Sequence, residues 1–115
     1  TENGEIIWST ITNKECKEIN INCDPGISAA VTAIPGAVIA GHLDGMIRVY
    51  DKENGKILWS FNSLRDYESI SGTPASGGSF SGSGPSIRNG YMAINSGYGL
   101  YNHMPGNALL LFSVD

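Results

Sequence analysis

Two adjacent side chains of opposite charge, Arg65 and Asp66, lie in a glycine- and serine-rich stretch at residues 62–84 that is long for a connection. Long connections are commonly functional. The planar guanidinium of an arginine can bind a carboxylate of a ligand, and an aspartate can accept a proton from a hydroxyl group. We therefore interpret Asp66 as a candidate catalytic base and Arg65 as a candidate binding residue. The alternative is a surface ion pair within a covering loop.

Both histidines of the chain stand near glycines in loop-like sequence. His42 lies with Asp44 in the turn "GHLDG", and His103 lies close to Tyr98 in the loop 96–107. We interpret these four residues as candidates for lining a substrate channel. One alternative is that Asp44 shapes its turn while His42 stays in solvent. The other is that the loop 96–107 simply packs on its own side chains.

Cys16 and Cys23 are separated by a short polar stretch, "CKEININC". An even number of cysteines at this spacing allows a disulfide that closes a small loop. The alternative is two reduced thiols in a cytosolic protein. A metal site is disfavoured because a tetrahedral metal ion would need two further ligands from elsewhere. The polar, loop-like character of the stretch favours the disulfide.

The composition argues against several classes of function. The formal net charge is −4 and no basic run is present, which disfavours binding to nucleic acid. The longest apolar runs, "ALLLF" and "AVIA", are far too short to span a membrane. Glycine accounts for 15 of the 115 residues, above the usual share of about 7%. Many glycines among short apolar runs favour tight turns and an all-β fold.

Short apolar segments alternate with turns between residues 30 and 61. The segment "MIRVYDKENGKILWSF" contains two strands joined by an Asn-Gly pair, which tolerates positive φ and suits a tight hairpin turn. Upstream, a Pro-Gly turn joins the strands 30–34 and 37–41, and "HLDG" forms the next turn. We therefore expect four antiparallel strands in a meander.

The same pattern recurs along the chain. "ENGEIIWS" at residues 2–9 differs from "ENGKILWS" at residues 53–60 at only two of eight positions. In the same way, "PSIRNGYMAINSGYG" and "ALLLFSVD" parallel "TAIPGAVIAGHLDG" and "MIRVYD". The repeat is therefore a four-stranded unit of roughly 50 residues, within the range of β-propeller blades.

The repeats divide the chain into five parts. We expect the last strand of a preceding blade at 1–10, an inter-blade loop with the cysteine pair at 11–26, and a complete blade at 27–61. A long inter-blade loop at 62–83 then leads to the first three strands of the final blade at 84–115. About two blades cannot close a ring and leave strand edges open. We therefore expect the C-terminal part of a larger propeller, or a chain that pairs with companion chains.

In a propeller, connections of two kinds open on the face around the central channel. These are the loops between blades and the loops between the second and third strands of a blade. In this sequence they are residues 42–45, 62–85 and 96–107, and all three are rich in glycine and polar residues. We therefore expect these three segments to come together.

The phrase "DGMIRVYDKENGKILWSF" resembles the tryptophan-docking repeat of quinoprotein propellers, which bind pyrroloquinoline quinone (PQQ). The residues that carry the resemblance are Gly45, Val49, Asp51, Gly55, Lys56 and Trp59, with Trp8 in the partial copy. In that family the tryptophan of one blade packs on the next blade, which implies a structural role for Trp8, Trp59 and Gly55. Longer phrases, such as "SISGTPASGGSFSGSGPSI" and "MPGNALLLFSVD", resemble the polyvinyl alcohol dehydrogenase type of quinoprotein.

This resemblance implies an eight-bladed, periplasmic or secreted propeller with PQQ and a calcium ion. It implies oxidation of alcohols, secondary alcohols or polyvinyl alcohol among them, with electrons passed to a cytochrome c. Arg65 would then bind a PQQ carboxylate, and Asp66 would take the hydroxyl proton as hydride leaves for the quinone.

The same resemblance leaves parts of the enzyme outside this sequence. The chain contains no Cys-x-x-Cys-His haem motif, and we do not expect it to be active alone. The alternative is a non-catalytic propeller scaffold for protein binding or outer-membrane assembly. Such scaffolds tend to keep shorter connections than residues 62–85.

Overall fold

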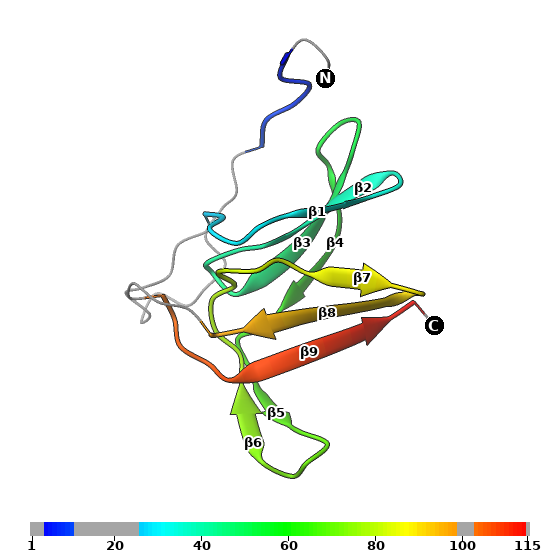
Figure 1. Ribbon diagram of the computed structural model, residues 1–115. Helices are drawn as coiled ribbons and strands as arrows, with labels where there is room; N and C mark the ends of the chain where they lie inside the picture. The colour runs from blue at the N-terminus through cyan, green and yellow to red at the C-terminus, as the bar shows by residue number, and fades with distance from the viewer. Residues whose placement is uncertain (1–3, 11–25, 99–102, 115) are drawn as a thin grey trace.

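The computed structural model describes residues 4–10, 26–98 and 103–114, and all its regular elements are β-strands. The first sheet has four antiparallel strands in chain order (Figure 1). They are β1 (Thr32–Ile34), β2 (Ala37–Gly41), β3 (Met46–Asp51) and β4 (Ile57–Asn62). The predicted all-β fold and the predicted meander are both confirmed. In the described part of the chain, no helix is long and apolar enough to span a membrane.

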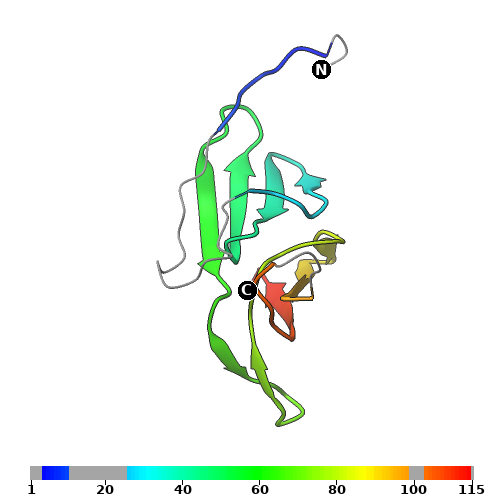
Figure 2. The same ribbon diagram turned by 90° about the vertical axis from the view of Figure 1, so that its left-hand side faces the viewer.

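A second, three-stranded sheet lies beside the first, as two views of the molecule show (Figures 1 and 2). Its strands are β7 (Ser86–Arg88), β8 (Tyr91–Ser96) and β9 (Ala108–Ser113). They pair antiparallel in the order β7-β8-β9. These are the strands that the sequence repeat aligns with β1, β2 and β3.

The two sheets have the same register. Ala37 pairs with Asp51 in the first sheet, and Tyr91, which the repeat aligns with Ala37, pairs with Ser113 in the second. The turns that precede β2 and β8 each contain a glycine with a positive φ, 83° and 80° respectively. A register shift of one residue would move every side chain of a strand to the opposite face of the sheet. Because the two registers agree, the repeat in the sequence is also a repeat in the structure.

The hydrophobic core lies between the facing surfaces of the two sheets. Alternate residues of β2 and β3 point toward alternate residues of β8 and β9, as expected for strands with one buried face. Phe80 fills the space between them from the connecting segment. The buried cluster consists of Ile39, Ile47, Phe80, Ile94, Ala108 and Leu110.

The connection at residues 62–83 contains regular structure that the sequence prediction missed. β5 (Asp66–Glu68) and β6 (Pro74–Ser76) form an antiparallel hairpin that projects away from both sheets (Figure 1). The Ser69 hydroxyl donates a hydrogen bond to the Thr73 carbonyl at 2.6 Å and closes the turn. The Gly72 N–H also donates to the Ser69 carbonyl at 3.0 Å, with Gly72 at a φ of 83°. Each strand of this hairpin has only three residues, too few to show a clear alternation of apolar and polar side chains.

The structure describes only some residues of the predicted strand at 1–10 and of the predicted inter-blade loop at 11–26. Residues 4–10 belong to none of the three described sheets. A strand needs a neighbouring strand to bond with, so the predicted last strand of a preceding blade stays a prediction. Cys16 and Cys23, with the disulfide predicted between them, lie outside the described residues.

Gly77 lies where the connecting segment comes closest to the first sheet, so a substitution there tests how tightly the two must pack. A Cβ atom at Gly77 would collide with the carbonyl oxygen of Ser63, a backbone atom that cannot rotate away. We expect Gly77→Ala to lower the free energy of unfolding by about 3 kcal/mol, measured by urea denaturation.

Gly82→Ala is the matched control, because its Cβ would meet no atom within 4 Å. Its φ of 80° gives it a strain cost of about 1 kcal/mol only. Equal losses for the two variants would show that the contact at Gly77 is not a strong constraint.

Candidate functional site

Three loops meet at one end of the two sheets. The backbone N–H of Phe80 donates a hydrogen bond to the His42 carbonyl at 3.0 Å, which joins the connecting segment to the β2–β3 turn. The next link is the Ser79 N–H, which donates to the Met104 carbonyl at 2.9 Å. The expectation that the three glycine-rich segments come together is therefore confirmed for the described residues.

Small side chains make this close approach possible. Ser63, Ser79 and Ser96, which we call the serine seam, have no solvent-exposed surface. The Ser63 hydroxyl donates to the Gly45 carbonyl at 2.7 Å, and the Ser96 hydroxyl donates to the Ser63 oxygen at 2.9 Å. The Gly78 N–H donates to the Ser96 oxygen at 2.9 Å. The seam thus satisfies backbone groups that water cannot reach.

A buried ion pair stabilises the β2–β3 turn. Arg48 and Asp44 are 3% and 0% exposed, and two hydrogen bonds of 2.8 and 3.2 Å join the guanidinium to the carboxylate. The same carboxylate accepts a hydrogen bond from the Met46 N–H at 3.1 Å. Asp44 therefore shapes its turn, as the sequence analysis allowed, and it also neutralises a buried charge. Such two-point pairing is geometrically specific.

His42 lies inside the protein, so the expectation that it stays in solvent was wrong. It is completely buried, and its Nε2 lies 3.0 Å from the Tyr50 hydroxyl. Tyr50 is buried as well, and burial raises its pKa above the usual value for tyrosine, an effect that Arg48 opposes and Asp44 reinforces. Because neither His42 nor Asp44 has exposed surface, the geometry does not support a channel-lining role for these two residues.

Arg65 and Asp66 lie on the surface, where a ligand can reach both. The Arg65 guanidinium carbon is 4.6 Å from the centre of the Phe61 ring, and its Nε donates to the Asn62 carbonyl at 3.1 Å. Asp66 is exposed and pairs with Ser76 at the start of the β5–β6 hairpin. The sequence analysis gave a surface ion pair between Arg65 and Asp66 as the alternative. No such ion pair is present among the described residues.

The third group of candidates lies beside a gap in the described chain. Tyr98 is 61% exposed. His103 is half-buried, and its Nδ1 is buried without a hydrogen-bond partner. Their role in a substrate channel stays a prediction. Across residues 4–10, 26–98 and 103–114, no group of three or more His, Cys, Asp or Glu could hold a metal ion.

Trp8 packs on the first sheet, at the end opposite the serine seam. Its ring stacks on Tyr50 with 6.0 Å between ring centres and 29° between planes. Its indole N–H donates to the Lys52 carbonyl at 2.7 Å. A Cβ at Gly55 would lie 2.5 Å from the Trp8 ring, so glycine is needed at this point of the turn.

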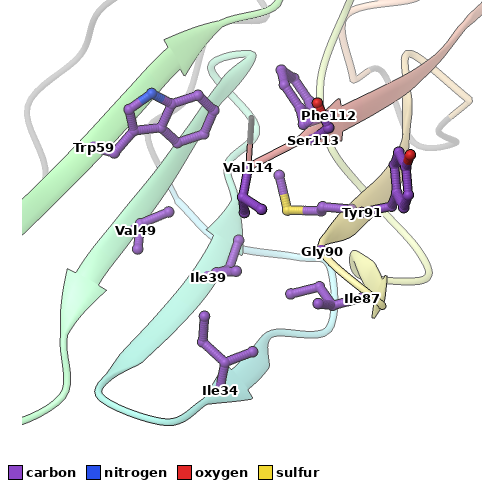
Figure 3. Close-up of a pocket in the computed structure, with 11 residues that line it drawn as sticks. Ile34, Ile39, Val49, Trp59, Ile87, Gly90, Tyr91, Phe112, Ser113 and Val114 are labelled. Atoms are coloured by element: carbon purple, nitrogen blue, oxygen red, sulfur yellow. The ribbon is translucent and has the colours of Figure 1, made fainter.

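Trp59 makes the corresponding contact one sheet further along. Its ring meets Phe112 edge-on, with 5.6 Å between ring centres and 81° between planes. The repeat aligns Phe112 with Tyr50, and Figure 3 shows Trp59 and Phe112 on opposite sides of the space between the sheets. Each tryptophan therefore packs on the sheet that follows it, which is the arrangement that the tryptophan-docking resemblance implies.

Two curated proteins are similar in sequence to this chain. The chain is 38% identical over 97% of its length to the polyvinylalcohol dehydrogenase of a Pseudomonas species. It is 34% identical over 97% of its length to the polyvinylalcohol dehydrogenase of Sphingopyxis sp. strain 113P3. The predicted resemblance is confirmed. The chain spans 19% of the length of each of these curated relatives, and no family model matches it.

The sequence analysis overlooked Arg48 and the serine seam. A charged residue between apolar neighbours on a strand, four residues after an aspartate, is a signal for a buried ion pair, and Arg48 fits it. The three serines gave no comparable signal, because they come together only through contacts between residues 33 positions apart, as for Ser63 and Ser96.

Asp44→Ala would leave the Arg48 guanidinium buried without its counter-charge. We expect this change to lower the free energy of unfolding by about 3–5 kcal/mol, measured by urea denaturation. Glu53→Ala, which removes an exposed carboxylate from the β3–β4 turn, is the control and should change it by less than about 0.5 kcal/mol. A small loss for Asp44→Ala would mean that water reaches Arg48.

Alkaline pH should destabilise the fold through its buried tyrosines. Burial raises the pKa of Tyr67, and the nearby Arg65 charge opposes this effect. The unfolded chain therefore loses the tyrosine proton first, so stability falls as the pH rises above about 10. Between about pH 9 and 11, the free energy of unfolding should fall less steeply in Tyr67→Phe than in the wild type. Identical slopes would contradict this linkage.

Proposed function

We propose that this chain is a segment of a quinoprotein alcohol dehydrogenase, and that it supplies about two of the propeller blades. The supporting observation is the similarity to two polyvinylalcohol dehydrogenases across 97% of the chain. The tryptophan contacts support it independently, since Trp59 joins the first sheet to the second and Trp8 packs on the first sheet in the corresponding way. Alcohols, including secondary alcohols and polyvinyl alcohol, are the proposed substrates.

Within such an enzyme the segment has a structural task that its contacts define. The serine seam fixes the two sheets at one end, and the contact between Trp59 and Phe112 joins them away from the seam. The loops at the seam end are then held at a constant position relative to the strands. This is the preorganisation that a catalytic face requires.

The described residues fit a quinone cofactor only in part. They contain no group of acidic side chains able to hold calcium, so calcium ligands would have to come from the rest of the enzyme. Arg65 is the residue that would hold a quinone carboxylate, because its side chain is exposed and supported by the Phe61 ring. A bound PQQ would supply the hydride acceptor. Asp66 would accept the hydroxyl proton of the alcohol.

Location and electron transfer complete the proposal. We infer a periplasmic or secreted enzyme that passes its electrons to a cytochrome c, as the quinoprotein resemblance implies. The remaining blades, in the same polypeptide or in companion chains, would complete the ring. A non-catalytic propeller scaffold remains the competing function.

The decisive experiment loads the full-length protein with PQQ and Ca²⁺ and follows dye reduction with a secondary alcohol. We expect turnover that depends on added PQQ. Turnover without PQQ, or none with it, would reject the dehydrogenase and favour the scaffold.

Arg65→Ala and Asp66→Ala in the full-length protein test the two site residues. Each should lower quinone-dependent kcat/KM by about 10²-fold or more, with the melting temperature nearly unchanged because both side chains are exposed. Glu53→Ala, at the opposite end of the sheet, is the control and should keep full activity. An unchanged rate in either site variant would remove that residue from the active site.

A further inference from the structure

A pocket lies where the β5–β6 hairpin meets the residue immediately before β9, and it has a volume of about 290 Å³. The residues that line it are Asp66, Tyr67, Pro74, Ala75, Ser76 and Asn107. Groups that can form hydrogen bonds and apolar groups therefore share one pocket. Such a lining suits a ligand that carries polar groups on a hydrocarbon chain.

Three polar residues follow one another across this pocket. Ser76 pairs with Asp66 on one side, in the β5–β6 register. On the other side the Ser76 N–H donates to Asn107 Oδ1 at 2.8 Å, and the Asn107 N–H donates to the Ser76 carbonyl at 2.8 Å. Because both backbone groups of Ser76 bond to Asn107, Asp66 and Ser76 form a pair without mutual backbone hydrogen bonds. In such pairs the side chains lie closest, with Cβ atoms about 5 Å apart.

Each of the three side chains has hydrogen-bonding capacity that the described chain does not use. The exposed Asp66 carboxylate is an acceptor. Among the described residues, the Ser76 hydroxyl has no hydrogen-bond partner. The Asn107 Oδ1 atom is occupied by the Ser76 N–H, which leaves its NH₂ group to donate. The row therefore offers a ligand an acceptor, a hydroxyl and a donor.

The base of the hairpin is held in place before any ligand binds. The Tyr67 hydroxyl donates to the Ser63 carbonyl at 3.0 Å, and the Gly77 N–H donates to the Arg65 carbonyl at 3.0 Å. Ser63 belongs to the serine seam, so the pocket has a fixed position relative to the two sheets. A preorganised pocket loses little free energy to ordering when a ligand binds.

We propose that this pocket is a subsite for alcohols that carry several hydroxyl groups on one chain, as polyvinyl alcohol does. The reacting hydroxyl lies at Asp66, and further hydroxyls of the same chain bond to Ser76 and Asn107. Pro74 and Ala75 contact the hydrocarbon between them. An alcohol with one hydroxyl leaves the other polar groups without a ligand partner, so the subsite favours polyhydroxylated substrates. The inference deepens the proposed function, on which the role of Asp66 rests.

Two variants of the full-length protein each remove one contact to the ligand. Ser76→Ala removes a hydroxyl that bonds to no described residue. Asn107→Asp keeps an acceptor for the Ser76 N–H and replaces the NH₂ donor. Thr73→Ala is the matched control, because Thr73 is exposed on the same hairpin and does not line the pocket.

The first measurement compares PQQ-dependent kcat/KM for polyvinyl alcohol with that for 2-pentanol. We expect this ratio to fall about fivefold in each pocket variant, the effect of one lost hydrogen bond, and to stay unchanged in Thr73→Ala. The charge that Asn107→Asp adds acts on Asp66 with both substrates, so its effect cancels in the ratio. Equal ratios in all four proteins, with turnover present, would overturn the subsite and leave the proposed dehydrogenase standing.

Binding to the PQQ-free full-length protein separates the two proposals. With the protein immobilised, the Kd for polyvinyl alcohol should rise about fivefold in Ser76→Ala and in Asn107→Asp, but not in Thr73→Ala. This pattern without PQQ-dependent turnover would support the pocket as a binding site for hydroxylated chains and reject the dehydrogenase. Equal Kd values for all four proteins, or no binding, would overturn the subsite.

Discussion

The close approach of three backbone segments at the serine seam is the constraint on which the other contacts depend. No side chain larger than hydrogen fits at Gly77 beside the Ser63 carbonyl. Because of this approach, the seam hydroxyls can bond to carbonyls of neighbouring loops, and Phe80 can enter the core between the two sheets. Such close contact between backbone segments leaves little room for the sheets to shift relative to each other. The loops at this end are therefore ordered by contacts between the sheets.

The two sheets share a backbone plan but differ in the chemistry of equivalent positions. Arg48 and Tyr50 of β3 correspond to Leu110 and Phe112 of β9. In the second sheet these positions are apolar and belong to or contact the core. In the first sheet they form a buried polar network with Asp44 and His42. Equivalent faces of the two sheets therefore present different chemistry to their neighbours, polar in the first sheet and apolar in the second.

The strands could be predicted from local signals, and their register followed from the repeat. Asn-Gly and Pro-Gly pairs mark turns, and the alternation of apolar residues between them marks strands. The environment of His42 could not be predicted, because Phe80, from a loop 38 positions away, bonds to its carbonyl. The β5–β6 hairpin was missed because its strands have only three residues each, and its turn, which Gly72 and the Ser69 hydroxyl close, contains no Asn-Gly or Pro-Gly pair. Arg65 and Asp66 could be chosen from composition, but only the three-dimensional structure shows that they do not form an ion pair.

The forward direction of the tryptophan contacts has a consequence for how the protein unfolds. The first sheet holds the Trp59 ring that covers the second sheet, so loss of Trp59 from its site uncovers the second sheet but leaves Trp8 on the first. Stability in such an array is a sum of intrinsic and nearest-neighbour contributions. The coupling between the two sheets is reciprocal, because the Trp59–Phe112 contact and the shared core belong to both. Fraying of the second sheet therefore exposes Ile39 and Ile47 of the first sheet, while the Trp8–Tyr50 contact on the first sheet stays in place.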